Sequence, residues 1–176
     1  MTDPLPDFRY YADPYGDRTI IEEDITCRVC GAQRAWKYDG VLYAADELDA
    51  ICPWCVANGH AAEKFDGCFQ DVMFPEAASE ESVLWVLMRT PSVASWNPFE
   101  WPEHCGECCR YIGDLRNHRH PGYIESASVQ TDLFEISRKT GLTRDEVLSW
   151  ADTGSIYLRL FQCVQCGTYR VILDLD

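Results

Sequence analysis

Four Cys-x-x-Cys pairs constrain this chain more than any other feature of its sequence. The pairs are Cys27/Cys30, Cys52/Cys55, Cys105/Cys108 and Cys163/Cys166, so they account for eight of the ten cysteines. Two intervening residues allow a tight turn to direct both thiolates at one tetrahedral ion, at a sulfur–zinc distance of about 2.3 Å. Since a four-thiolate site uses two such pairs, the sequence predicts two structural Zn²⁺ ions with all eight cysteines as ligands.

Two other uses of paired cysteines compete with zinc. The segment Cys52-Pro53-Trp54-Cys55 resembles a redox dithiol, but a redox fold needs one such pair and this chain has four. A disulfide framework would suit a secreted chain. The opening Met1-Thr2-Asp3-Pro4 has neither the basic nor the apolar region of a secretory signal. Zinc is therefore the favoured interpretation, and a reducing cytoplasm is the expected compartment.

Sequence order predicts that the first pair joins the second and the third joins the fourth. Gly31 and Gly167 follow the second cysteine of a pair, where a positive φ lets backbone N–H groups turn toward the sulfurs. Crossed pairing stays open. Cys109 is an alternative to Cys108, although the two-residue spacing favours Cys108.

The other candidate residues have a simpler interpretation. Cys68 is expected to be a small buried hydrophobe. His118 and His120 have metal-compatible spacing, but a solvated loop is favoured because no third ligand is nearby. His104 is expected beside the metal or at the surface rather than as a base. No Gly-rich phosphate loop, Gly-x-Ser-x-Gly or His-Glu-x-x-His motif is present, and closed four-thiolate sites leave no position for substrate, so a non-enzymatic protein is predicted.

The predicted fold class is α+β, with two zinc-ribbon-like four-cysteine knuckle modules, short β-hairpins and several intervening helices. Residues 1–90 would form the N-terminal module and 91–176 the C-terminal one, with one compact domain as the alternative. Residues 19–26 are expected to be irregular. Hairpins are expected over 35–44, with a turn at Asp39-Gly40, and over 156–173. Helices are expected over 54–65, 75–90, 131–140 and from Thr143. Ser79 or Ser82 is the expected cap of the second helix, and Thr143 and Glu146 have the spacing of a capping box at the start of the last.

The net charge of the chain restricts the classes of macromolecule that it is expected to bind. Twenty-nine acidic against fifteen basic residues give −14. Up to Thr90 there are 17 acidic and 7 basic residues, or −10, and beyond it 12 and 8, or −4. Such a surface repels phosphate backbones, which argues against nucleic acid, and favours encounter with a basic protein. The alternative is that the acidity only maintains solubility.

No apolar run in the sequence approaches the roughly 18 residues of a membrane span.

Several motifs together resemble the CbrC family, also called the UPF0167 family. The likeness covers nearly the whole chain, and its central motif runs from Ile51-Cys52-Pro53-Trp54-Cys55 to Phe69. The other matching segments are Leu5-Pro6-Asp7-Phe8-Arg9-Tyr10 with Asp13-Pro14, Arg89-Thr90-Pro91, Trp96, Trp101, His104-Cys105-Gly106 with Cys108, and Phe161 with Cys163, Cys166 and Gly167.

The family name implies tolerance to a colicin, a bacterial nuclease toxin, and no enzymatic activity is attached to the family. The resemblance therefore suggests an immunity-type protein. An acidic surface agrees with this, because immunity proteins often present negative charge to the nucleic-acid site of a nuclease. The expected contact surface comprises Glu22, Glu23, Asp24, Asp46, Glu47 and Asp49. The remaining alternative is a dithiol oxidoreductase that uses Cys52 and Cys55.

Overall fold

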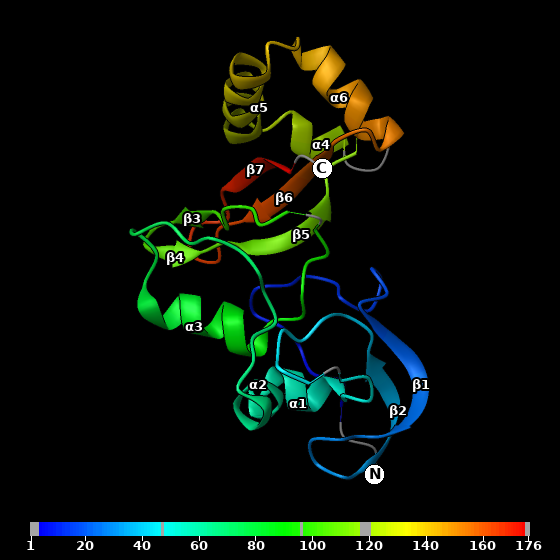
Figure 1. Ribbon diagram of the computed structural model, residues 1–176. Helices are drawn as coiled ribbons and strands as arrows, with labels where there is room; N and C mark the ends of the chain where they lie inside the picture. Colours follow the sequence, from blue (N-terminus) through cyan, green and yellow to red (C-terminus); the bar gives the residue numbers. More distant parts are fainter. Residues whose placement is uncertain (1–3, 47, 96, 117–120, 175–176) are drawn as a thin grey trace. The chain divides into compact units, whose positions relative to one another are not determined.

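The computed structural model describes residues 4–46, 48–95, 97–116 and 121–174 (Figure 1). Its contacts divide the chain into two compact units. Unit 1 comprises Met1–Val72 and Ser79–Ala94, and unit 2 comprises Met73–Ala78 and Ser95–Asp176. The chain passes from unit 1 to unit 2 for the last time after Ala94. Each unit contains one of the cysteine clusters described below.

Unit 1 is built on a two-stranded antiparallel sheet. Strand β1 (Ile20–Thr26) pairs with β2 (Gln33–Tyr38), with Ile20 opposite Tyr38 and Thr26 opposite Gln33. The predicted hairpin over 35–44 is therefore wrong, and so is the irregular segment expected over 19–26. The turn of the actual hairpin is the first cysteine knuckle. A bulge between Glu22 and Ile25 interrupts the alternation that would have marked β1 as a strand.

Three helices complete unit 1. The chain forms α1 (Pro53–Ala57) and α2 (His60–Phe65), where one helix over 54–65 was expected. The break follows from Gly59, whose φ of 82° lies in the left-handed region and cannot continue a helix. Helix α3 runs from Glu80 to Arg89, so it begins later than the helix expected over 75–90. Its N-cap is Ser79, one of the two candidates that the sequence offered, and the Ser79 side chain accepts a hydrogen bond from the Ser82 backbone.

Unit 2 contains a β-hairpin and a three-stranded sheet. The hairpin joins β3 (Glu103–His104) to β4 (Glu107–Cys108). The sheet has the antiparallel order β5-β6-β7, with strands Arg110–Asp114, Tyr157–Gln162 and Tyr169–Asp174. The predicted C-terminal hairpin is confirmed as β6 and β7, and β5 was not anticipated.

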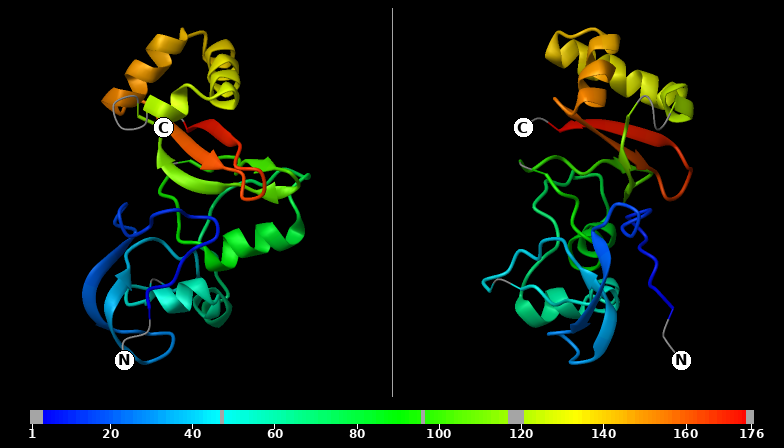
Figure 2. Two further views of the ribbon diagram at one scale, coloured as in Figure 1. Left: turned by 180° about the vertical axis from the view of Figure 1, so that it is seen from behind. Right: turned by 90° about the vertical axis from the view of Figure 1, so that its right-hand side faces the viewer.

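Helices cover one face of the three-stranded sheet (Figures 1 and 2). They are α4 (Pro121–Ile124), α5 (Ala127–Thr140) and α6 (Arg144–Thr153). The predicted capping box is confirmed at α6, where the side chains of Thr143 and Glu146 exchange hydrogen bonds with each other's backbone. Buried apolar side chains fill the space between helices and sheet: Leu115, Ile124, Val129, Leu133, Ile136, Val147, Leu148, Ala151, Ile156, Leu158, Leu160 and Val171.

The other face of the sheet in unit 2 carries aromatic side chains. Phe161 packs against Trp101 and Tyr111, with ring centroids 5.2 and 5.3 Å away. The Trp101 indole donates a hydrogen bond of 2.8 Å to the carbonyl of Cys109, which satisfies its polar group inside the core. This packing fixes the segment that leads into the β3–β4 hairpin.

Among the described residues, no helix combines the length and hydropathy needed to cross a bilayer.

Candidate metal centres

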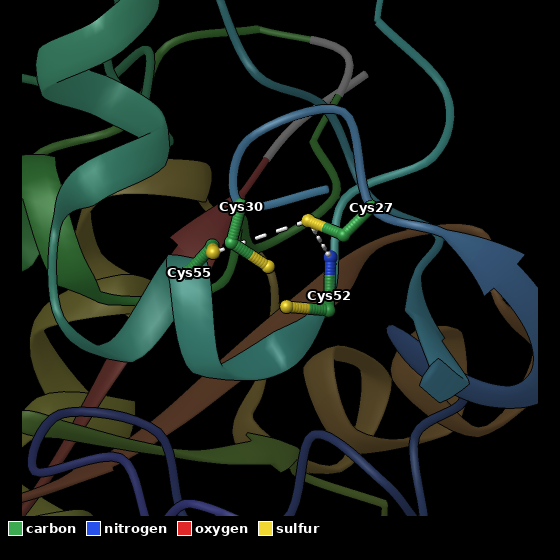
Figure 3. A group of neighbouring side chains, drawn as sticks. All are labelled: Cys27, Cys30, Cys52 and Cys55. Carbon is green, nitrogen blue, oxygen red and sulfur yellow. Dashed lines mark hydrogen bonds between the residues drawn. The ribbon is translucent and has the colours of Figure 1, made fainter. Parts of the chain in front are cut away.

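Centre 1 comprises Cys27, Cys30, Cys52 and Cys55 in unit 1. One ligand atom from each residue lies within 4.8 Å of the others. Figure 3 shows the four side chains converging, two from the turn after β1 and two from the start of α1. Three of the four are at most 2% exposed, and only Cys30 reaches solvent. The first and second Cys-x-x-Cys pairs therefore lie together, as their order in the sequence predicted.

The turn of centre 1 is held by its own backbone. The Cys27 N–H donates to the carbonyl of Ala32 at 2.9 Å, and the Gly31 N–H donates to the carbonyl of Cys27 at 2.8 Å. Gly31 has a φ of 73°, which an L-residue adopts at a cost. The Lys64 ammonium of α2 donates to the carbonyls of Arg28 and Val29, at 2.8 and 2.9 Å. Helix α2 thus fixes the turn from outside.

Hydrogen bonding and burial shift the thiol pKa values of centre 1 in opposite directions. A hydrogen bond from Cys52 lowers the pKa of the Cys27 thiol to about 4, helped by backbone N–H groups. Donating that hydrogen bond raises the pKa of Cys52, and burial raises the pKa of Cys55 to about 12. The pKa of Cys27 is thus lowered while those of Cys52 and Cys55 are raised. A bound divalent cation reverses this balance because it stabilises all the thiolates together.

Centre 2 comprises His104, Cys105, Cys163 and Cys166 in unit 2, again with one ligand atom of each within 4.8 Å of the others. The Nδ1 atom of His104 lies 3.2 Å from the Sγ atom of Cys105 and 3.3 Å from that of Cys166. Hydrogen bonding to Thr168 lowers the pKa of Cys166 to about 6, and the hydrogen bond with Cys166 raises that of Cys105 to about 11. Cys105 and Cys166 are exposed and Cys163 is buried.

The fourth pair forms the same turn as the first. The Cys163 N–H donates to the carbonyl of Thr168 at 2.8 Å, and the Gly167 N–H donates to the carbonyl of Cys163 at 3.0 Å. Gly167 has a φ of 75°. Residue for residue, these hydrogen bonds repeat those from Cys27 to Ala32. The pattern Cys-x-x-Cys-Gly therefore builds one local structure twice, once between β1 and β2 and once between β6 and β7.

The third pair is folded differently. Cys105 and Gly106 form the tip of the β3–β4 hairpin with φ values of 58° and 78°, the arrangement of a type I′ turn. Cys108 pairs with Glu103 and His104 with Glu107, so these two pairs fall on opposite faces of the hairpin. Cys108 is fully buried and is not a member of centre 2, where the structure places His104 instead. Sequence reasoning had left His104 outside the ligand set, and its position next to Cys105 was the only available signal.

Both centres fit a tetrahedral metal ion. Four sulfurs at about 2.3 Å from such an ion lie about 3.8 Å from one another. The Sγ atoms of Cys27 and Cys55 are 3.9 Å apart, and those of Cys105 and Cys166 are 3.7 Å apart. None of the ten cysteines, all of them within the described residues, is in a disulfide. The donor sets are therefore geometrically suited to bind metal, with thiolate and imidazole ligands of the kind that zinc prefers.

Cys68 and Cys109 lie outside both centres. Cys109 is buried, which raises the pKa of its thiol to about 12. The Cys68 thiol is half-buried and donates to the carbonyl of Gln70 at 3.3 Å. Four further residues singled out from the sequence lie outside the described residues: Glu47, Trp96, His118 and His120.

Known proteins resemble this chain over nearly its whole length. The family model "Uncharacterised protein family (UPF0167)" matches residues 5–175. The UPF0167 protein Mb2317 of Mycobacterium bovis is 33% identical over 97% of this chain and 93% of its own length, as is the UPF0167 protein MT2352 of Mycobacterium tuberculosis. The UPF0167 protein PA1536 of Pseudomonas aeruginosa is 28% identical over 99% of both chains. No solved structure matches the chain significantly.

Proposed function

The chain belongs to the UPF0167 family, and we propose that it is a non-enzymatic binding protein whose two units are each stabilised by one zinc ion. The observation that carries the proposal is the convergence of four donor atoms at each centre, all within 4.8 Å. Four protein ligands complete a tetrahedral sphere and leave no position for water or substrate. The ions would then hold the fold together, with no part in a reaction.

Zinc would contribute a large share of the stability of each unit. A structural zinc ion contributes on the order of 10 kcal/mol, which is comparable to the whole stability of a domain. In unit 1 the ion would tie the β1–β2 hairpin to α1, and in unit 2 it would tie the β3–β4 hairpin to the turn between β6 and β7. Each ion thus joins segments that are distant in sequence.

The partner that we propose is a basic protein, of the nuclease-toxin kind that an immunity protein would meet. Three consecutive acidic side chains of β1 support this, because Glu22, Glu23 and Asp24 are all exposed. Asp46 and Asp49 are exposed in the loop before α1. We call these five residues the acidic surface of unit 1. Lys37, which is partly buried, pairs with Glu23 at 3.4 Å. Arg28 and Asp49, both exposed, lie 3.7 Å apart, and an exposed pair of this kind is weak enough for a partner to replace.

Salt-dependent binding tests the partner proposal. Purified cationic nuclease toxin domains would be titrated onto the zinc-loaded protein at several salt concentrations. Binding that weakens as salt rises is expected, because exposed charges are screened beyond about 10 Å at 0.1 M salt. Replacing Glu22, Glu23 and Asp24 by Lys should abolish it. A control for the gain of a lysine elsewhere is Asp145→Lys, an exposed acid in α6 of unit 2, and it is compared with the single variant Glu23→Lys, which changes the charge by the same amount. The partner proposal fails if no toxin domain binds at low salt, or if Asp145→Lys weakens binding while the substitutions at Glu22, Glu23 and Asp24 do not.

The alternative is a dithiol oxidoreductase that uses Cys52 and Cys55. Both side chains are at most 2% exposed and share centre 1 with Cys27 and Cys30. A redox pair needs an accessible thiolate that reacts at once, whereas buried zinc thiolates react slowly until a chelator removes the ion. Titration of the native protein with a thiol reagent, with and without chelator, separates the two. Immediate reaction of Cys52 or Cys55 without chelator would favour the oxidoreductase.

A further inference from the structure

The two centres differ in how much of their sulfur reaches solvent. In centre 1, Cys27, Cys52 and Cys55 are 1%, 0% and 2% exposed, which leaves Cys30 as its one exposed ligand. In centre 2, both Cys105 and Cys166 are exposed. Only centre 2 therefore presents two thiolates to a reagent dissolved in water.

The two exposed sulfurs are also neighbours. The Sγ atoms of Cys105 and Cys166 are 3.7 Å apart, and a disulfide requires about 2.05 Å. Each residue sits in a hairpin turn, Cys105 between β3 and β4 and Cys166 between β6 and β7. A Cβ atom added to Gly106, next to Cys105, would meet nothing within 4 Å. The tip of this hairpin thus has open space in which to move, and the sulfurs can close the remaining distance.

We propose that Cys105 and Cys166 are a site of reversible oxidation by peroxide, and that disulfide formation there releases the metal of centre 2. This inference rests on the metal-binding part of the proposed function and is independent of the partner. One thiolate attacks a peroxide oxygen, which forms a sulfenic acid and releases hydroxide from hydrogen peroxide. The second thiolate then attacks that sulfur, which forms the disulfide and releases a second hydroxide. Two electrons pass from the two sulfurs to the peroxide, so that two thiolates and one hydrogen peroxide give one disulfide and two hydroxide ions.

Loss of these two ligands leaves His104 and Cys163 at centre 2. Two protein ligands are too few for a stable tetrahedral site, so the ion leaves. A small thiol reverses the reaction by exchange with the disulfide, which restores both thiolates and allows the metal to bind again.

Centre 1 supplies an internal control for the role of access. The Sγ atoms of Cys27 and Cys55 are 3.9 Å apart, nearly the same separation as at centre 2. Both of these residues are buried. If the distance between the sulfurs set the rate of oxidation, the two centres would oxidise at similar rates. If solvent access of the sulfurs sets the rate, centre 2 loses its metal first.

The test uses the full chain loaded with zinc. Metal analysis before treatment should give two zinc ions, which checks the proposed function separately. Hydrogen peroxide is then added with a chromogenic zinc chelator, and peptides are mapped by mass spectrometry after alkylation. We expect one zinc ion to be released at least about tenfold faster than the other, together with a Cys105–Cys166 disulfide, and dithiothreitol to restore binding. Simultaneous release of both ions, a first disulfide at centre 1, or release without a disulfide would overturn the proposal.

Two variants sharpen the result. Cys166→His keeps a zinc ligand at this position but removes the partner sulfur, so zinc should stay bound under peroxide. The double variant Cys68→Ala, Cys109→Ala removes the two cysteines outside the centres and should release zinc as the wild type does. Unchanged release from Cys166→His, or loss of release in the double variant, contradicts the proposal. If Cys166→His does not bind zinc, peptide mapping of the wild type is the test. A Cys105–Cys166 disulfide after peroxide treatment then supports the proposal, and release of zinc without that disulfide contradicts it.

Discussion

The Nδ1 atom of His104 lies 3.3 Å from the Sγ atom of Cys166, although 62 residues separate them in sequence. The β3–β4 hairpin brings them together, because its tip carries His104 and Cys105 to the turn between β6 and β7. Centre 2 is thus a cluster of three cysteines and one histidine in the structure. The sequence had predicted four cysteines, with Cys108 as the fourth ligand.

The first prediction concerns the fourth ligand of centre 2. His104→Ala should weaken the second metal site by at least about 100-fold, since even residues that only orient a ligand cost 10–100-fold when replaced. Cys108→Ala should retain two metal ions and lose only packing. Cobalt substitution gives the measurement, because the intensity of the sulfur-to-cobalt absorption follows the number of thiolates. Full metal content in His104→Ala, combined with loss in Cys108→Ala, would assign the ligand to Cys108.

A second prediction concerns the turn of centre 1. Gly31→Ala should destabilise unit 1 by about 1–2 kcal/mol, because Gly31 has a φ of 73° and an added Cβ strains that conformation. Steric contact is not the cause, since the added atom would meet nothing within 4 Å. Gly122 is the matched control: it has the same open surroundings, lies in α4 and lacks a positive φ. Gly122→Ala should be neutral or stabilising in the same urea titration. Equal effects of the two variants would refute the explanation.

A third prediction concerns a buried charge network in unit 2. Arg159 is 6% exposed and donates to the carboxylate of Asp174 at 2.9 Å and to that of Asp114. Asp174 also accepts a hydrogen bond of 2.7 Å from Ser95. Asp174→Asn should cost about 3 kcal/mol of unfolding free energy, because it leaves a buried guanidinium without one of its counter-charges.

The control for this network is an exposed ion pair of the same unit. Glu135 and Arg138 lie 2.8 Å apart on the surface of α5, with side chains 45% and 68% exposed. Glu135→Gln should change the unfolding free energy by no more than about 0.5 kcal/mol. Chemical denaturation of both variants measures the difference. If Asp174→Asn is as mild as the control, the buried network contributes little to the stability of unit 2.

Local signals in the sequence predicted the elements that depend on local structure. Thr143 and Glu146 form the capping box that their spacing indicated, and the alternating residues after Ser155 form β6. Strand β1 was missed for a physical reason. Its acidic residues from Glu22 to Asp24 lie at a bulge, and its hairpin turn is a cysteine knuckle that carries none of the usual turn residues before Gly31.

The sequence also indicated which cysteine pairs lie together, but it could not identify His104. The knuckle turns depend on the glycine after the second cysteine, a feature that is visible in the sequence at Gly31 and Gly167. The third pair lacks that glycine. Cys105 instead adopts a positive φ at a hairpin tip, which is uncommon for any residue other than glycine. That backbone conformation follows from the pairing of β3 with β4, and no local pattern reports it.

The metal content of the purified protein tests the central claim most directly. Elemental analysis and native mass spectrometry should find two zinc ions per chain. Removing them with a chelator should unfold both units, because each ion contributes on the order of 10 kcal/mol. A folded protein that contains no metal, or that keeps its fold after both ions are removed, would contradict the account.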